Sequence, residues 1–231
     1  MGENVLLTRD GLIATVTLNR PDRRNSLSDP MLTELGAAFA ELRDDASTRV
    51  VIVTGAPPVF SAGADAGLKS SMSAEERRQA MGSRKSQFRR LFERANTVLE
   101  NLEQTTIAAI NGHAVGGGWG LTLACDFRIA SAEAQLWIPE VDLGVPLGVA
   151  STTRFVRMVG PARAKEIIMR HHLAGPDRDH DAEFAQQAPH RVQARGPCRH
   201  PHRAQPVQRC QRLLRLRLHG HRADLLIAEG F

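Results

Sequence analysis

The sequence predicts an α/β fold with mainly parallel strands, because short apolar runs alternate with stretches of helical periodicity. Val50–Val53 is a continuous apolar run, which is typical of a strand covered on both faces of a parallel sheet, and Thr106–Ile110 is predicted to be another buried strand. Alternation of strands and helices indicates a layered arrangement with parallel pairing. The chain has 231 residues, of which 42% are hydrophobic, so it can bury a substantial core without a disulfide or metal.

The first elements have clear boundaries. Leu12–Leu18 is rich in β-branched residues and lies between Gly11 and the Asn19-Arg20-Pro21 turn, so it is predicted to be a strand. Asp29 and Pro30 then begin a helix, with Asp29 as N-cap and Pro30 at the first helical position. The apolar residues of this helix recur at helical spacing and predict one buried stripe. They are Met31, Leu32, Leu35, Phe39 and Leu42.

Elements further along the chain follow the same alternation. A loop rich in Gly and Pro, Gly55–Asp65, follows the strand Val50–Val53, and a long polar helix is expected from about Ala74 to Gln104. After Thr106–Ile110, a triple glycine leads into a helical stretch, Trp119–Ala124. Two short strands and one more helix complete the prediction: Phe127–Ala130, Gln135–Ile138 and Gly160–Met169.

Composition divides the chain near Asp177. Residues 1–170 carry 20 Lys and Arg against 19 Asp and Glu, whereas residues 171–231 carry 10 Arg, 6 acidic residues and eight of the nine histidines. We therefore expect a core over residues 1–177 and an atypical, poorly ordered C-terminal segment over residues 178–231. Abundant Arg, His and Pro is typical of a GC-rich gene translated out of frame. We hypothesise a compensated frameshift over residues 178–222, which resequencing would test.

Composition also argues against several classes of protein. Cys125, Cys198 and Cys210 have no paired spacing, so neither a disulfide framework nor a metal site is expected. The sequence begins without a secretory-signal pattern, and no run approaches the roughly 18 apolar residues of a membrane span, so we expect a cytoplasmic protein without a membrane partner. The Arg-rich segment could bind nucleic acid through phosphates, but only Phe184 and Phe231 could stack on bases there, and acidic residues interrupt its charge.

Three places combine residue types that suit chemistry on a carbonyl group. The small residues of Phe60–Asp65 let backbone N–H groups face a ligand, and Gly116–Gly118 opens a helix whose first N–H groups are free. Glu140, after Pro139, follows an apolar strand, where burial would raise its pKa toward general acid–base work. Considered separately, each has a structural explanation. The Phe60–Asp65 loop fits an ordinary tight connection, Gly116–Gly118 fits close packing of the backbone, and Glu140 fits a surface residue on a loop. Together they suit an oxyanion hole beside a base. His113 is interpreted as a structural loop residue.

Six motifs follow one another along the chain. They are Asn19-Arg-Pro21 with Asn25-Ser-Leu27, Val51–Gly55, Phe60–Asp65, Ile110–Gly118, Ala124–Ala130 and Ile138–Gly144. In this order they closely resemble the crotonase (enoyl-CoA hydratase/isomerase) superfamily, over about residues 5–177. The resemblance implies a crotonase-like spiral of ββα units and acyl-CoA thioester substrates, with no separate cofactor because coenzyme A is part of the substrate. It also implies homotrimers or hexamers.

The resemblance assigns roles to individual residues. The oxyanion-hole N–H groups would be those of Ala64 and Gly117, and Glu140 matches one of the two glutamates that hydratases of the family use. Six further residues would contact the acyl-CoA: Arg24, Ala62, Gly63, Asp65, Leu68 and Gly116. Of these, Arg24 would lie near the CoA phosphates.

One departure from the family pattern affects the expected reaction. The second glutamate should stand at position 120, where this chain has Gly120. Hydration is best served by two carboxylates, whereas moving a double bond from the 3- to the 2-position needs one base, and isomerases of the family manage with the equivalent of Glu140. We therefore expect an enzyme that forms a stabilised enolate and favours isomerisation. The alternative is a degenerate, non-catalytic acyl-CoA-binding protein, because residues 178–222 do not resemble the family's pocket-covering helices.

Overall fold

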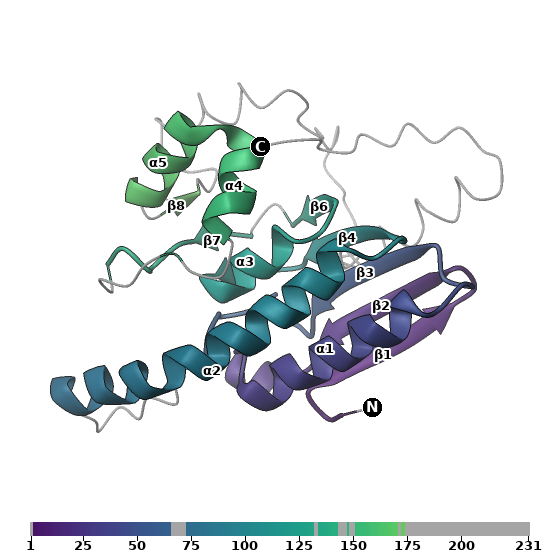
Figure 1. The fold of residues 1–231 in the computed structure, drawn as a ribbon, viewed down its shortest axis with the longest axis horizontal. Helices are drawn as coiled ribbons and strands as arrows, with labels where there is room; N and C mark the ends of the chain where they lie inside the picture. Colours follow the sequence, from purple (N-terminus) through teal and green to yellow (C-terminus); the bar gives the residue numbers. More distant parts are fainter. Residues whose placement is uncertain are drawn as a thin grey trace, which may run out of the picture.

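A five-stranded sheet with the strand order β1-β2-β3-β4-β6 forms the centre of the structure, which is a computed structural model (Figure 1). β1 (Val5–Asp10) and β2 (Ile13–Leu18) form an antiparallel hairpin. β3 (Val50–Gly55), β4 (Thr105–Ile110) and β6 (Phe127–Ala130) each add in parallel to the previous strand. The predicted α/β class with mainly parallel pairing is confirmed.

The structure describes residues 2–65, 73–131, 134–142, 147, 151–170 and 172–173. The predicted C-terminal segment over residues 178–231, including the hypothesised frameshift over residues 178–222, lies outside the described residues, as does Leu68.

Helices α1 (Asp29–Arg43) and α2 (Ala74–Glu100) lie side by side over one face of the sheet (Figure 1). Val51 and Val53 point into the core beneath them, whereas Val50 and Ile52 pack on the other face. All four side chains are buried, so the uninterrupted apolar run of β3 follows from burial on both faces, as predicted.

A second row of short strands runs beside the main sheet. β5 (Ala114–Val115) pairs in parallel with β7 (Leu136–Trp137), which pairs antiparallel with β8 (His172–Leu173). Two isolated parallel bridges, Ser61 with Ala114 and Leu27 with Ala64, continue the row toward the N-terminus.

Apart from β8, which follows α5, each member of this second row follows a strand of the main sheet and precedes a helix. The helices are α1 after Leu27, α2 after the Ser61–Ala64 loop, α3 (Gly117–Thr122) after β5 and α4 (Ser151–Val159) after β7. Repetition of this unit gives the spiral of ββα units that the sequence predicts. A short 3-10 turn, η1 (Pro21–Arg23), and a last described helix, α5 (Pro161–Arg170), complete the elements.

Several boundaries differ from the prediction. The N-cap of α1 is Ser28, whose Oγ accepts the Met31 N–H at 3.4 Å, rather than Asp29. Helix α2 ends at Glu100 instead of residue 104. The Gln104 side chain lies outside the helix and donates to the Leu42 carbonyl in the last turn of α1 and to the Asp45 carbonyl just after it. The N-terminus of α3 is Gly117 rather than Trp119. Strands β1, β5 and β8 and helix α4 were not predicted.

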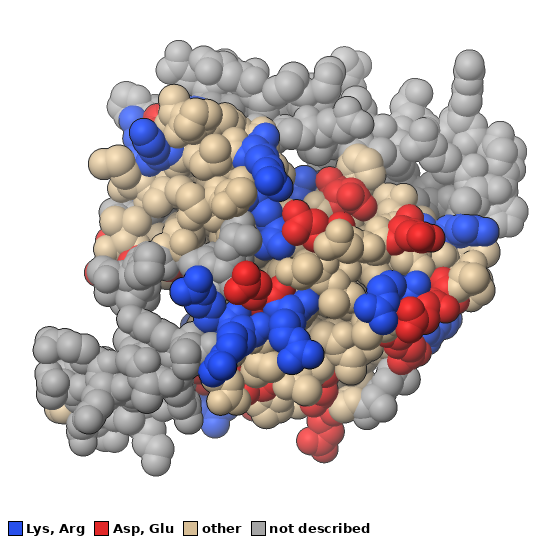
Figure 2. Space-filling view, in the orientation of Figure 1, with Lys and Arg blue, Asp and Glu red and all other residues tan. Residues whose placement is uncertain are grey.

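On the face shown in Figure 2, basic and acidic side chains are interspersed, which gives this face no single sign of charge. Among the described residues, no helix is both long and apolar enough to cross a membrane. Within the same residues, no group of three His, Cys, Asp or Glu side chains could hold a metal ion.

Asn25 connects the first two turns of the spiral. Its side chain is fully buried, and its Nδ2 donates to the Ala56 and Val59 carbonyls at 2.7 and 2.8 Å. Its Oδ1 accepts the Arg20 N–H at 2.9 Å. The backbone of Asn25 is left-handed, with φ at 52°, a conformation that Asn tolerates better than most residues. One side chain thus satisfies three backbone groups of two loops.

Substitution of this residue should be costly to stability. Asn25→Ala leaves two carbonyls and one N–H without partners, so we expect the free energy of unfolding to fall by about 2–4 kcal/mol. Urea denaturation of the full chain measures the change. Asn101→Ala, which removes an exposed side-chain bond to the Thr97 carbonyl, is the matched control and should cost under about 0.5 kcal/mol. Equal losses in the two variants would contradict the structural role of Asn25.

Candidate active site

Two backbone segments that are distant in sequence come into direct contact beside the second row of strands. A Cβ built on Gly63 would lie 2.5 Å from the Val115 carbonyl oxygen and 3.4 Å from the Gly117 nitrogen. Gly63 also has φ at +85°, which L side chains rarely adopt. Both the space and the conformation therefore require glycine, and no side chain separates the two segments.

The amides of Ala64 and Gly117 lie next to each other at this contact. A Cβ on Gly117 would be 3.7 Å from the Ala64 nitrogen. The bridge to Leu27 uses the Gly63 carbonyl and the Asp65 N–H, so the Ala64 N–H is left out of it. Gly117 is the first residue of α3, where an N–H has no acceptor within the helix. Among the described residues, neither amide donates a hydrogen bond, and the pair can therefore bind one oxygen atom.

Ser61 holds the loop in position for this contact. Its buried Oγ donates to the Asn25 carbonyl at 2.8 Å and accepts the Gly63 N–H at 3.1 Å. A Cβ on Gly118 would lie 2.6 Å from the Ser61 Cβ, so this third glycine is required where α3 packs on the loop. The sequence analysis did not single out Ser61, although it lies inside the Phe60–Asp65 motif.

The predicted acyl-CoA residues surround the same loop. The exposed Arg24, with φ at 50°, accepts the N–H of the exposed Ala62 on its carbonyl at 2.9 Å. Asp65 is held by Arg20, whose Nη1 lies 2.8 Å from Asp65 Oδ2, and by the Ser26 hydroxyl at 3.2 Å. The role of Arg20 in fixing this loop could not be predicted, because the ion pair joins residues that are distant in sequence.

Glu140 lies against the first of the three glycines. Its Oε1 is 2.9 Å from the place where a Cβ on Gly116 would stand, and the φ of Gly116 is +50°. Glu140 Oε2 is buried without a hydrogen-bond partner among the described residues. Burial raises the pKa of Glu140, in the direction that the sequence predicts, although the residue's own backbone N–H lowers it somewhat. A carboxylate with a raised pKa is a stronger base than an exposed one.

Apolar side chains from α2 border the two amides. The Phe88 ring lies 3.6 Å from a Cβ built on Gly117 and stacks on Phe92 with 5.6 Å between centroids. These rings limit water access on that side, which strengthens hydrogen bonds to a developing charge. Both residues lie within the helix predicted from about Ala74 to Gln104, but their position beside Gly117 could not be predicted from the sequence.

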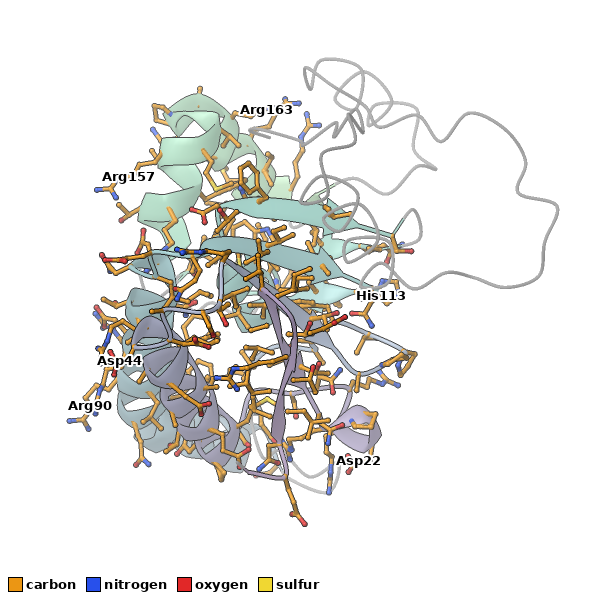
Figure 3. The ribbon with its side chains drawn as sticks, turned by 90° about the vertical axis from the view of Figure 1, so that its right-hand side faces the viewer. Asp22, Asp44, Arg90, His113, Arg157 and Arg163 are labelled. Atoms are coloured by element: carbon orange, nitrogen blue, oxygen red, sulfur yellow. The ribbon has the colours of Figure 1, made fainter. Side chains whose placement is uncertain are left out.

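Other reactive residue types have structural explanations. His113 lies on the opposite side of the sheet from Arg90 (Figure 3), and its Nδ1 accepts the Gln135 N–H at 3.2 Å, in keeping with the structural interpretation. Burial raises the pKa of the Cys125 thiol to about 12, so this cysteine stays protonated and unreactive.

Comparison with known proteins gives this arrangement a context. The family model described as enoyl-CoA hydratase/isomerase matches residues 8–179. The chain belongs to this family. It is 40% identical over 166 residues to the short-chain-enoyl-CoA hydratase of Clostridium acetobutylicum, covering 71% of this chain and 60% of that protein. It is 36% identical over 167 residues to the crotonyl-CoA hydratase of Syntrophomonas wolfei, covering 72% of this chain and 61% of the relative.

Solved structures of the enoyl-CoA hydratase/isomerase family have the same fold. A putative enoyl-CoA hydratase from Thermobifida fusca in complex with CoA aligns with a TM-score of 0.65 and 33% identity, over 80% of this chain and 69% of that one. The crotonase fold predicted from the sequence motifs is thus confirmed for the described part of the chain. The chain spans about three fifths of the length of the curated relatives it matches.

The contact between the two glycine segments can be tested by matched substitutions. Gly63→Ala introduces a Cβ 2.5 Å from a carbonyl oxygen, so we expect an unfolding free-energy loss of at least 2–3 kcal/mol. Gly11→Ala is the control, since Gly11 has φ at +59° with no atom within 4 Å of its Cβ, and should cost only the backbone strain of about 1–2 kcal/mol. Thermal unfolding of both variants measures the difference. Equal shifts would show that the two segments do not touch.

Proposed function

We propose that this chain acts on acyl-CoA thioesters through an enolate intermediate, and that it favours isomerisation of 3-enoyl-CoA over hydration of 2-enoyl-CoA. The adjacent amides of Ala64 and Gly117, which donate no hydrogen bond among the described residues, carry this proposal together with the nearby, partly buried carboxylate of Glu140. Membership of the enoyl-CoA hydratase/isomerase family and the CoA-bound solved relative support the thioester as substrate.

The two amides would act on the thioester carbonyl. When a proton leaves C2, the electron pair of the C–H bond moves toward the carbonyl and negative charge develops on its oxygen. Two fixed N–H donors stabilise that oxygen more strongly in the transition state than in the ground state. Because they are backbone groups held by glycine contacts, they need little reorganisation during the reaction.

Glu140 would move the proton. The ionised carboxylate accepts a proton from C2, the double bond shifts from the 3- to the 2-position, and the protonated Glu140 returns a proton to C4. The product is an isomer of the substrate with the same charge. The carboxylate of Glu140 is restored, and neither an oxidant nor a second base is needed. Its raised pKa brings it closer to that of the thioester's C2–H, which makes the transfer easier.

The absence of a side chain at Gly120 supports isomerisation over hydration. Adding water to C3 requires a group that orients the water in addition to the group that handles the C2 proton, and position 120 supplies no carboxylate. The named relatives are hydratases, so the proposed preference for isomerisation rests on Gly120.

The loop around Ala62–Asp65 is proposed to contact the acyl-CoA, with Gly63 and Gly116 allowing close approach. Arg24 is exposed beside Ala62 and provides a cation for the CoA phosphates. Leu68 is proposed to contribute from outside the described residues. We also propose a cytoplasmic homotrimer or hexamer, in keeping with the resemblance described above.

Removing the base should abolish turnover and preserve binding. Glu140→Gln is expected to lower kcat for 3-hexenoyl-CoA isomerisation by about 100-fold or more, with the Kd for the thioester within a few-fold of wild type. Glu103→Gln is the control and should leave kcat unchanged, because Glu103 is exposed and distant in sequence from Glu140 and from both amides. Rapid crotonyl-CoA hydration that survives Glu140→Gln, or no isomerisation at all, would contradict the proposal. Saturable thioester binding without any turnover would instead support the non-catalytic binder.

The pH dependence should report the same carboxylate. The base must be ionised, and its ionised form predominates only above its pKa in the folded protein, which burial raises above the ordinary value of 4.5. We therefore expect kcat/KM for isomerisation to fall as the pH decreases, with an apparent pKa above 4.5. An acidic limb at or below that value would show that the active base is not the buried Glu140.

A further inference from the structure

The place of the missing side chain at position 120 is occupied by another residue. A Cβ built on Gly120 would lie 2.7 Å from the Ser151 hydroxyl oxygen and 3.4 Å from the Phe92 ring. Ser151 is the first residue of α4 and is 4% exposed. Among the described residues its hydroxyl has no hydrogen-bond partner. A hydroxyl without a partner in the protein can donate to and accept from a ligand.

This hydroxyl lies on the same face of α3 as the Gly117 amide region. Gly117 and Gly120 are three residues apart in one helix, so their Cβ positions are neighbours, about 5–6 Å apart. The stacked pair Phe88 and Phe92 confirms the alignment, since Phe88 contacts the first position and Phe92 the second. Ser151 is thus one helical turn from the proposed carbonyl site, along an apolar wall.

Helix α4 is fixed in this place by an ion pair. Arg154, one turn after Ser151, is buried, and its Nη2 lies 2.6 Å from Glu100 Oε2 at the end of α2. The Phe155 ring packs edge-on against Trp119 of α3 at 4.9 Å between centroids. Both contacts hold α4 against α2 and α3, so the Ser151 hydroxyl has a defined position.

We propose that Ser151 is a specificity-determining residue that hydrogen-bonds an oxygen on C3 of the acyl chain, and that Gly120 leaves the space for it. The proposal rests on the proposed binding of acyl-CoA at the Ala64 and Gly117 amides. A C3 substituent lies roughly 4–5 Å from the carbonyl oxygen, because each intervening bond adds about 1.2–1.5 Å. That distance matches one turn of α3, and a hydroxyl can both donate to and accept from such an oxygen.

Binding of two thioesters that differ only in this oxygen tests the inference without turnover. The Kd values of 3-hydroxybutyryl-CoA and butyryl-CoA are measured by calorimetry on the full chain. We expect the wild type to bind the 3-hydroxy compound about threefold to tenfold more tightly, and Ser151→Ala to bind both equally. Thr153→Ala, which removes an exposed hydroxyl from the same turn of α4, is the matched control and should keep the wild-type ratio.

A second variant keeps the serine and removes its space. Gly120→Ala would displace the Ser151 hydroxyl, so it should also abolish the preference for the 3-hydroxy compound. Circular dichroism checks that each variant is folded.

Equal Kd values for the two thioesters in the wild type, or a preference that survives Ser151→Ala, would overturn the inference even if isomerisation is observed. A preference that depends on Ser151 in a chain without turnover would support it and reject the isomerase. If neither thioester binds, both proposals are overturned.

Discussion

The site depends on one constraint, the direct contact of two backbones at Gly63 and Val115–Gly117. A Cβ 2.5 Å from a carbonyl oxygen cannot be accommodated, so the contact exists only with glycine. It places side by side the amides of Ala64 and Gly117, neither of which donates a hydrogen bond within the described residues, and it fixes the start of α3. The contacts beneath it serve the same geometry, since Ser61 holds the loop and Asn25 joins that loop to the first turn of the spiral.

Glu140 complements this backbone site because it is poorly solvated. Its carboxylate lies beside a glycine that offers no side-chain donor, and its Oε2 is buried without a hydrogen-bond partner in the described part of the chain. The same burial that raises its pKa makes the ionised form costly, and such a cost is a common property of active sites. Two donors for an oxygen and one poorly solvated base thus lie beside the N-terminus of α3, an arrangement that suits enolate chemistry.

Elements buried on both faces, such as β3 and β4, could be predicted because burial leaves continuous apolar runs in the sequence. β5 and β8, which were not predicted, are two residues long and leave no periodic pattern. Helix α4 carries Arg154 on its buried side, where an ion pair with Glu100 replaces an apolar contact. The positions of Ala64, Gly117 and Glu140 could be found because glycines and an isolated acid are visible as motifs. Ser151 and Phe88 could not be found, because only the packing of α2 and α4 on α3 brings them near.

The central claim is that the two amides polarise a thioester carbonyl. Isotope-edited Raman difference spectroscopy of a bound acyl-CoA with a ¹³C-labelled carbonyl measures this directly and requires no turnover. The account predicts a carbonyl stretch at lower frequency in the bound thioester than in water, and the same shift in Glu140→Gln, because the donors are backbone groups. A saturably bound thioester whose carbonyl stretch is unchanged from its value in water would contradict the account.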